Sequence, residues 1–147
     1  MNMECQLMVY KHILAAIDLS DDSEVLVHKA ALLAKALDAK LSLIHIDVDY
    51  ADLYTGLIDI NLAEMHERAE SDAQTRLHQL AQKTQYPVSH TLVGSGDLSE
   101  EICHAIKNMD IDLVICGHHQ DFWSKILSST RQLLSRTPVD LLMIPLK

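Results

Sequence analysis

The chain is poor in basic residues, which argues against a nucleic acid as its partner. Its 147 residues include 12 lysines and arginines against 21 aspartates and glutamates, a formal net charge of −9. Proteins that bind DNA or RNA draw most of their affinity from basic side chains on phosphates, so we expect no nucleic-acid partner. Hydrophobic residues make up 48% of the chain, too large a share for a disordered protein and consistent with one folded domain.

Cysteine and long apolar runs are also scarce. The cysteines are Cys5, Cys103 and Cys116, and no two of them form a C-x-x-C pair. This odd, unpaired set predicts reduced thiols rather than a disulfide framework, and the apolar patterns around Cys103 and Cys116 predict small buried hydrophobic residues. No apolar run approaches the roughly 18 residues that a membrane span needs. We therefore expect a cytoplasmic protein with no membrane partner.

The first residues do not resemble a secretory signal. Met1 to Leu7 contains an acidic residue, Glu4, and no basic one. Met8 follows directly and precedes the first apolar segment. We expect residues 1–8 to be a disordered extension, or an upstream start with Met8 as the true first residue, and residues 9–147 to form the domain.

Apolar strands alternate with amphipathic helices along the chain. We predict strands at 9–17, 41–46, 91–93, 113–116 and 141–144, the last of them closed by Pro145. Helices are predicted after the polar caps Ser20–Ser23, along the stripe from Leu62 to Leu80, after the cap Asp97, and over 124–136. This order predicts a single-domain, three-layer α/β sandwich, in which a five-stranded parallel sheet has helices on both faces.

A ligand of such a sheet binds at the carboxyl ends of the strands. The residues predicted there are Asp18, Ile46 with Asp47, Gly94–Gly96 and Gly117–Gln120. They contain no nucleophile–base pair, so we predict no catalytic residues. Gly94-Ser95-Gly96 begins like G-x-G-x-x-G, but the sixth position is Ser99 and the run follows the third strand, not the first. A tight turn followed by a helix cap explains it better.

The nine histidines form no recognisable metal-binding motif. The chain has no H-E-x-x-H, and seven of the histidines are scattered without close cysteine or histidine partners. His118 and His119 are adjacent, so their side chains would point apart in extended backbone, and Asp121 is the acidic residue close to them. We expect no metal site.

The chain resembles the universal stress protein family, and within it the universal stress protein A branch. The resemblance covers residues 9–147, and its most specific segments are Tyr10–Leu14, Asp18–Ser20, Leu43–Val48, Asp52–Asp59, Gly94–Leu98 and Gly117–Lys125. It implies a sheet of order 3-2-1-4-5, of the adenine nucleotide alpha hydrolase-like type. It also implies a homodimer in which the last strands, Val139 to Pro145, pair across a two-fold axis, and possible heterodimers with paralogues. Pairing would cover an apolar edge that is otherwise prone to association, and Pro145 would limit its length.

The nucleotide-binding branch of this family carries the motif G-x2-G-x9-G-(S/T) after the fourth strand. Gly117 matches the first glycine, but Gln120, Thr130 and Arg131 stand at the other three positions. Side chains at Gln120 and Thr130 would occupy space where the backbone should approach phosphate. The resemblance is therefore to the branch that does not bind ATP. If a nucleotide did bind, this degenerate pocket would include Asp18, Ile46, Gly117 and Thr130.

From these features we expect a non-catalytic, dimeric stress-response protein that needs no cofactor and acts through protein contacts. The alternative is a switch that binds or hydrolyses ATP. It is supported by Asp18, by Gly117 and by the nearby hydroxyls of Ser124, Ser128, Ser129 and Thr130. A third hypothesis makes some of these hydroxyls targets of phosphorylation, because a phosphate near a helix N-terminus is electrostatically tolerated.

Overall fold

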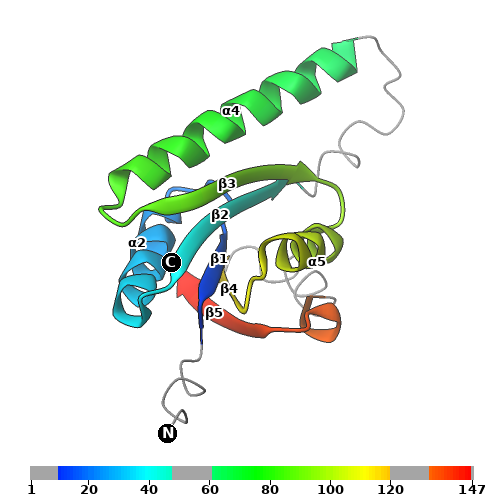
Figure 1. Cartoon of the computed structure of the whole chain (residues 1–147). Helices are drawn as coiled ribbons and strands as arrows, with labels where there is room; N and C mark the ends of the chain where they lie inside the picture. The colour runs from blue at the N-terminus through cyan, green and yellow to red at the C-terminus, as the bar shows by residue number, and fades with distance from the viewer. Residues whose placement is uncertain (1–9, 48–60, 120–132, 147) are drawn as a thin grey trace, which may run out of the picture.

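A computed structural model describes residues 10–47, 61–119 and 133–146, which form a three-layer α/β sandwich (Figure 1). The strands are β1 (His12–Ala16), β2 (Lys40–Asp47), β3 (Val88–Ser95), β4 (Leu113–His119) and β5 (Asp140–Leu146). The helices are α2 (Ser23–Leu37), α4 (Asn61–Lys83) and α5 (Leu98–Met109). The predicted fold class is therefore confirmed.

The five strands form one parallel sheet in the order β3-β2-β1-β4-β5. This is the order that the family resemblance implied. β1 lies at the centre, where Ala16 is opposite Ile44 of β2 on one side and Cys116 of β4 on the other. A central strand covered on both faces can be apolar along its length, and β1 is apolar from Ile13 to Ala16, after its first residue, His12.

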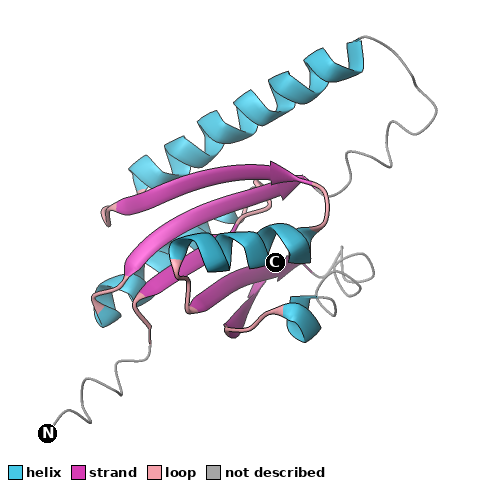
Figure 2. Cartoon of the chain, turned by 45° about the vertical axis from the view of Figure 1, so that its right-hand side comes forward, coloured by secondary structure: helices cyan, strands magenta, loops and turns pink. Residues whose placement is uncertain are grey.

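Helices cover both faces of the sheet, with α2 and α4 on one face and α5 on the other (Figure 2). Because successive strand side chains point to opposite faces, Ile13 and Ala15 of β1 pack toward α2 and α4, whereas Leu14 packs toward α5. Each helix buries its apolar stripe against the sheet. The buried helix residues include Leu26, Ala30 and Ala34 of α2, Ala73 and Leu77 of α4, and Ile102, Ala105 and Ile106 of α5.

Four strands, β2, β3, β4 and β5, are longer than their apolar segments predicted, whereas β1 is shorter than the predicted 9–17. β3 begins at Val88, not Thr91, and the exposed Ser89 and His90 near its start interrupt the apolar pattern. The prediction that Pro145 closes the last strand is wrong, because β5 continues through it to Leu146. Within the described part of the chain β5 is an edge strand whose neighbour is β4, so a residue without an N–H group can be tolerated within it.

The last predicted helix is described only at its end. Residues 133–136 are helical, and Leu133 is buried on the α5 face of the sheet, whereas residues 124–132 lie outside the described part of the chain. None of the helices in the described ranges is both long enough and apolar enough to cross a membrane.

Candidate functional site

The sheet register brings three of the predicted site residues to one edge of the molecule. Ala16 is opposite Ile44 and Cys116, so Asp18, two residues further along, comes level with Ile46 of β2. Gly117 directly follows Cys116 on the other side of β1. Ile46 is buried on the α5 face, and Asp18 is exposed. Of these three residues, Asp18 supplies an exposed carboxylate and Ile46 a buried apolar side chain.

Asp18 organises the start of α2. Its Oδ1 accepts a hydrogen bond from the backbone N–H of Ser20 at 3.0 Å and another from the Ser23 hydroxyl at 3.3 Å. The predicted side-chain cap is wrong at Asp22, which stands at the N-cap position without a side-chain cap bond. The carboxylate before the turn organises it instead, so Asp18 has a structural role that needs no ligand.

Two side chains from neighbouring elements fix the connection between β1 and α2. Nδ1 of His45, on β2, donates to the carbonyl oxygen of Ile17 at 2.7 Å, and the guanidinium of Arg76, on α4, donates to the carbonyl oxygen of Leu19. Leu19 is buried and has a φ of 61°, a left-handed conformation that is uncommon for leucine. Neither donor could be predicted from the sequence, because neither belongs to a motif and each bonds to a backbone carbonyl.

Gly117 is surrounded by leucine side chains. A Cβ atom at this position would lie 2.5 Å from Cδ1 and 3.2 Å from Cγ of Leu146, and 3.4 Å from Cδ2 of Leu26. Leu146 belongs to the core, with 6% of its surface exposed. Close packing of β5 and α2 against β4 is therefore a sufficient reason for the glycine. A phosphate is not needed to explain it.

In the other glycine run, the turn at Gly96 and the cap at Asp97 were predicted, whereas Gly94 and Ser95 belong to β3 and not to the turn as predicted. Gly96 has a φ of 113°, which favours glycine, and no atom lies within 4 Å of its Cβ position. Oδ1 of Asp97 then accepts the backbone N–H of Ser99 at 3.1 Å and caps α5. Gly94 lies within β3, where a Cβ atom would be 3.3 Å from Oε2 of Glu101. None of these contacts requires a dinucleotide.

The two described cysteines differ in their surroundings. Cys116 is buried, as predicted, and burial raises the pKa of its thiol to about 12. A thiol with so high a pKa is not a nucleophile at neutral pH. Cys103 is half-buried, not fully buried as predicted, and its Sγ donates to the carbonyl oxygen of Arg136 at 3.7 Å.

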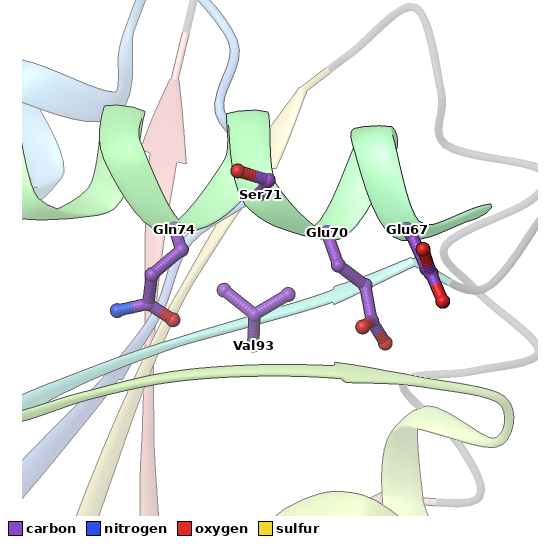
Figure 3. A pocket seen from close by; sticks show the side chains of 5 residues that line it. All are labelled: Glu67, Glu70, Ser71, Gln74 and Val93. Carbon is purple, nitrogen blue, oxygen red and sulfur yellow. The ribbon is translucent and has the colours of Figure 1, made fainter. Parts of the chain in front are cut away.

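Two clefts lie away from the carboxyl edge residues Asp18 and Gly117. The larger, with a volume of about 340 Å³, is lined by Glu67, Glu70, Ser71 and Gln74 of α4 and by Val93 of β3 (Figure 3). In the described part of the chain, His, Cys, Asp and Glu side chains form no group of three that could hold a metal ion. The larger cleft is acidic and open, with the carboxylates of Glu67 and Glu70 in its lining.

Several predicted residues lie outside the described part of the chain. They are Gln120, Asp121, Thr130, Arg131 and the hydroxyls of Ser124, Ser128 and Ser129. His118 and His119 belong to β4, but the structure does not describe their side chains. At these positions, the departure from the phosphate motif is therefore known from the sequence and not from the structure.

The sequence model of the universal stress protein family matches residues 9–145 of the chain. The chain belongs to the universal stress protein family. It is 57% identical to universal stress protein A of Yersinia pestis over 140 residues, which cover 95% of each chain. Membership supports a role in the stress response. The fold agrees, since the chain is similar in structure to a universal stress protein UspA from Lactobacillus plantarum, with a TM-score of 0.65, 21% identity and coverage of 92% and 97%.

A second structural neighbour bears on the ligand question. It is a universal stress protein whose crystal structure is in complex with cAMP, with a TM-score of 0.61, 16% identity and coverage of 93% of this chain and 98% of that one. At this identity the likeness shows a shared fold.

Proposed function

We propose that this universal stress protein is a non-catalytic, cytoplasmic stress-response factor that binds no ATP and acts as a homodimer through protein contacts. The observation that carries the proposal is the packing around Gly117. The one glycine of the phosphate motif that the chain retains is accounted for by contact with Leu146 and Leu26. The remaining positions hold Gln120, Thr130 and Arg131, so nothing in the motif is left that calls for phosphate.

The dimer is proposed through β5. This strand is last in the sheet order, so one of its edges has no strand beside it among the described residues. Leu142 is 41% exposed there, although it is a large apolar residue. Antiparallel pairing of Val139 to Pro145 with the same segment of a second copy would cover that edge and that side chain. Heterodimers with paralogues would use the same strand.

Nucleotide binding is tested with the purified, nucleotide-free full chain. Isothermal titration with ATP should give no heat of binding at protein concentrations that would detect micromolar affinity. Micromolar binding would refute the proposed absence of a cofactor.

The dimer is tested by sedimentation velocity. The parent protein should sediment as a dimer, and Leu142→Asp should weaken association because it places a charge in an apolar contact. Leu32→Asp is the matched control, since Leu32 is a 54% exposed leucine that belongs to α2 and not to β5. A monomeric parent, or an unchanged dimer in Leu142→Asp, would contradict the β5 interface.

The second candidate function is a nucleotide-dependent switch. It is favoured by the retention of Asp18 and Gly117 at the carboxyl edge, and by the structural neighbour whose complex contains cAMP. Titration with cAMP alongside ATP separates the two candidates. Binding of either one, lost in Asp18→Ala with the fold intact by circular dichroism, would favour the switch.

A further inference from the structure

A buried histidine occupies the amino edge of the sheet, at the end of β1 opposite Asp18. His12 is the first residue of β1 and is 6% exposed. Buried polar groups in proteins are hydrogen-bonded, and a buried histidine is also a titratable group held away from water. Nothing in the proposed function uses this side chain.

The His12 ring joins three elements. Its Nδ1 lies 2.9 Å from the carbonyl oxygen of Met109, the last residue of α5, and its Nε2 lies 2.7 Å from the hydroxyl oxygen of Ser42 on β2. A carbonyl oxygen can only accept, so Nδ1 carries the hydrogen. In the neutral ring Nε2 then accepts from the hydroxyl of Ser42, which has no exposed surface.

Further hydrogen bonds hold the backbone on either side of the His12 ring. The carboxylate of Asp112 accepts the N–H groups of Lys11 at 2.7 Å and of His12 at 3.0 Å. The backbone N–H of Asp112 in turn donates to the carbonyl oxygen of His12 at 3.1 Å. The backbone N–H of Lys40 donates to the carbonyl oxygen of Lys11 at 2.8 Å. The chain segments that meet at His12 therefore depend on one another.

Burial and the groups that face the ring have opposing effects on the pKa of His12. Burial is the largest cause and lowers the pKa of His12 below its ordinary value of 6.5, whereas the bond to Met109 raises it. Lys40 on β2 and His90 on β3 lower it further, and the ring of His90 lies 6.5 Å away between centroids. Asp112 raises it, but less than these groups lower it.

We propose that His12 is an acid-sensitive latch, which ties β1, β2 and the end of α5 together while its ring is neutral and loosens this joint when the ring is protonated. A protonated ring carries hydrogens on both nitrogens. Nε2 can then no longer accept, so the Ser42 hydroxyl has to turn and loses the acceptor of its own hydrogen in a site that water does not reach. The positive charge itself would be buried beside Lys40 and His90.

The direction of the pH dependence follows from linkage. Below pH 6.5 the opened chain binds a proton at His12 more readily than the closed one does, so opening becomes easier as the pH falls. The stabilisation is fully present above pH 6.5 and is lost as the pH falls toward the pKa of the folded protein. In that window the equilibrium constant for opening the joint rises by up to about tenfold per pH unit.

The first test uses NMR on the unmodified protein. The ring nitrogens should show the Nδ1–H tautomer at pH 7, and His12 should titrate below pH 6.5. Amide exchange at Lys40 and Asp112, corrected for the intrinsic rate, should accelerate on acidification. The amide of Ile17 is the internal control, because it donates to Ile44 at the opposite edge of the sheet. Titration at or above 6.5, or equal acceleration at both edges, would overturn the latch.

The second test uses variants. His12→Gln keeps a donor for Met109 and an acceptor for Ser42 without a titrating group, so its unfolding temperature should fall less than that of the parent between pH 7 and 5. His104→Gln, an exposed histidine on α5, is the matched control and should follow the parent. His90→Gln removes one of the groups that lower the pKa of His12 and should move the titration of His12 to higher pH. An identical pH dependence in His12→Gln and the parent would refute the proposal.

Discussion

Substituting Gly117 by alanine tests whether this glycine is kept for packing. The added Cβ would lie 2.5 Å from Cδ1 and 3.2 Å from Cγ of Leu146, closer than side-chain carbons normally approach. Overfilling a packed core costs about 1–3 kcal/mol, and replacing a strand glycine recovers about 0.4–1 kcal/mol from the unfolded chain. We expect Gly117→Ala to lower the free energy of unfolding by about 1–2 kcal/mol.

The cause of that loss is identified by a double-mutant cycle. Leu146→Ala alone should cost about 2 kcal/mol, the low end for a buried leucine, because it lies near the end of an edge strand. In the Leu146→Ala background the added methyl has room, so Gly117→Ala should cost almost nothing there.

Urea unfolding monitored by circular dichroism measures each corner of the cycle. Gly96→Ala is the control, since its cost comes from a φ of 113° in open space and should not depend on Leu146. The reasoning fails if Gly117→Ala is harmless in the parent, or equally costly in both backgrounds.

Three further predictions concern single sites. Asp97→Ala should lower the free energy of unfolding by about 1 kcal/mol because it removes the cap bond to Ser99, and Asp97→Asn should restore most of the loss in urea unfolding. Leu77→Ala, which truncates a fully buried residue of α4, should cost about 2–5 kcal/mol in the same assay, and a cost below 1 kcal/mol would contradict the packing of α4 on the sheet. Cys116 should not react with a thiol reagent at pH 8 until the protein is unfolded, because burial holds its pKa at about 12, and mass spectrometry after labelling would reveal an exception.

The order of strands and helices could be predicted because each element shows its own period. Leu26, Ala30 and Ala34 recur at helical spacing, and all three are buried in α2. The path of β5 through Pro145 could not be predicted from the residue alone. Whether a proline ends a strand depends on the place of that strand in the sheet. The strand order was implied by the family resemblance and could not be predicted from the local sequence pattern.

The candidate site was predicted in position but not in its chemistry. Strand alternation places Asp18, Ile46 and Gly117 at the carboxyl edge, and the register confirms that placement. What Gly117 contacts depends on Leu146, 29 positions further along the chain and on another strand. A local motif cannot show such a contact. From the sequence alone, Gly117 therefore matched a phosphate motif, and its packing against Leu146 became visible only in the structure.

The central position of β1 has a consequence for how the chain folds during synthesis. β1 is made early, yet one of its two neighbours, β4, follows one hundred residues later, with Ile13 opposite Leu113. Until β4 emerges from the ribosome, one edge of this strand, which is apolar from Ile13 to Ala16, has no partner, and closing so long a loop is slow. We expect the nascent chain to expose this edge to chaperones for most of its synthesis, and the sheet to close only in its last stage.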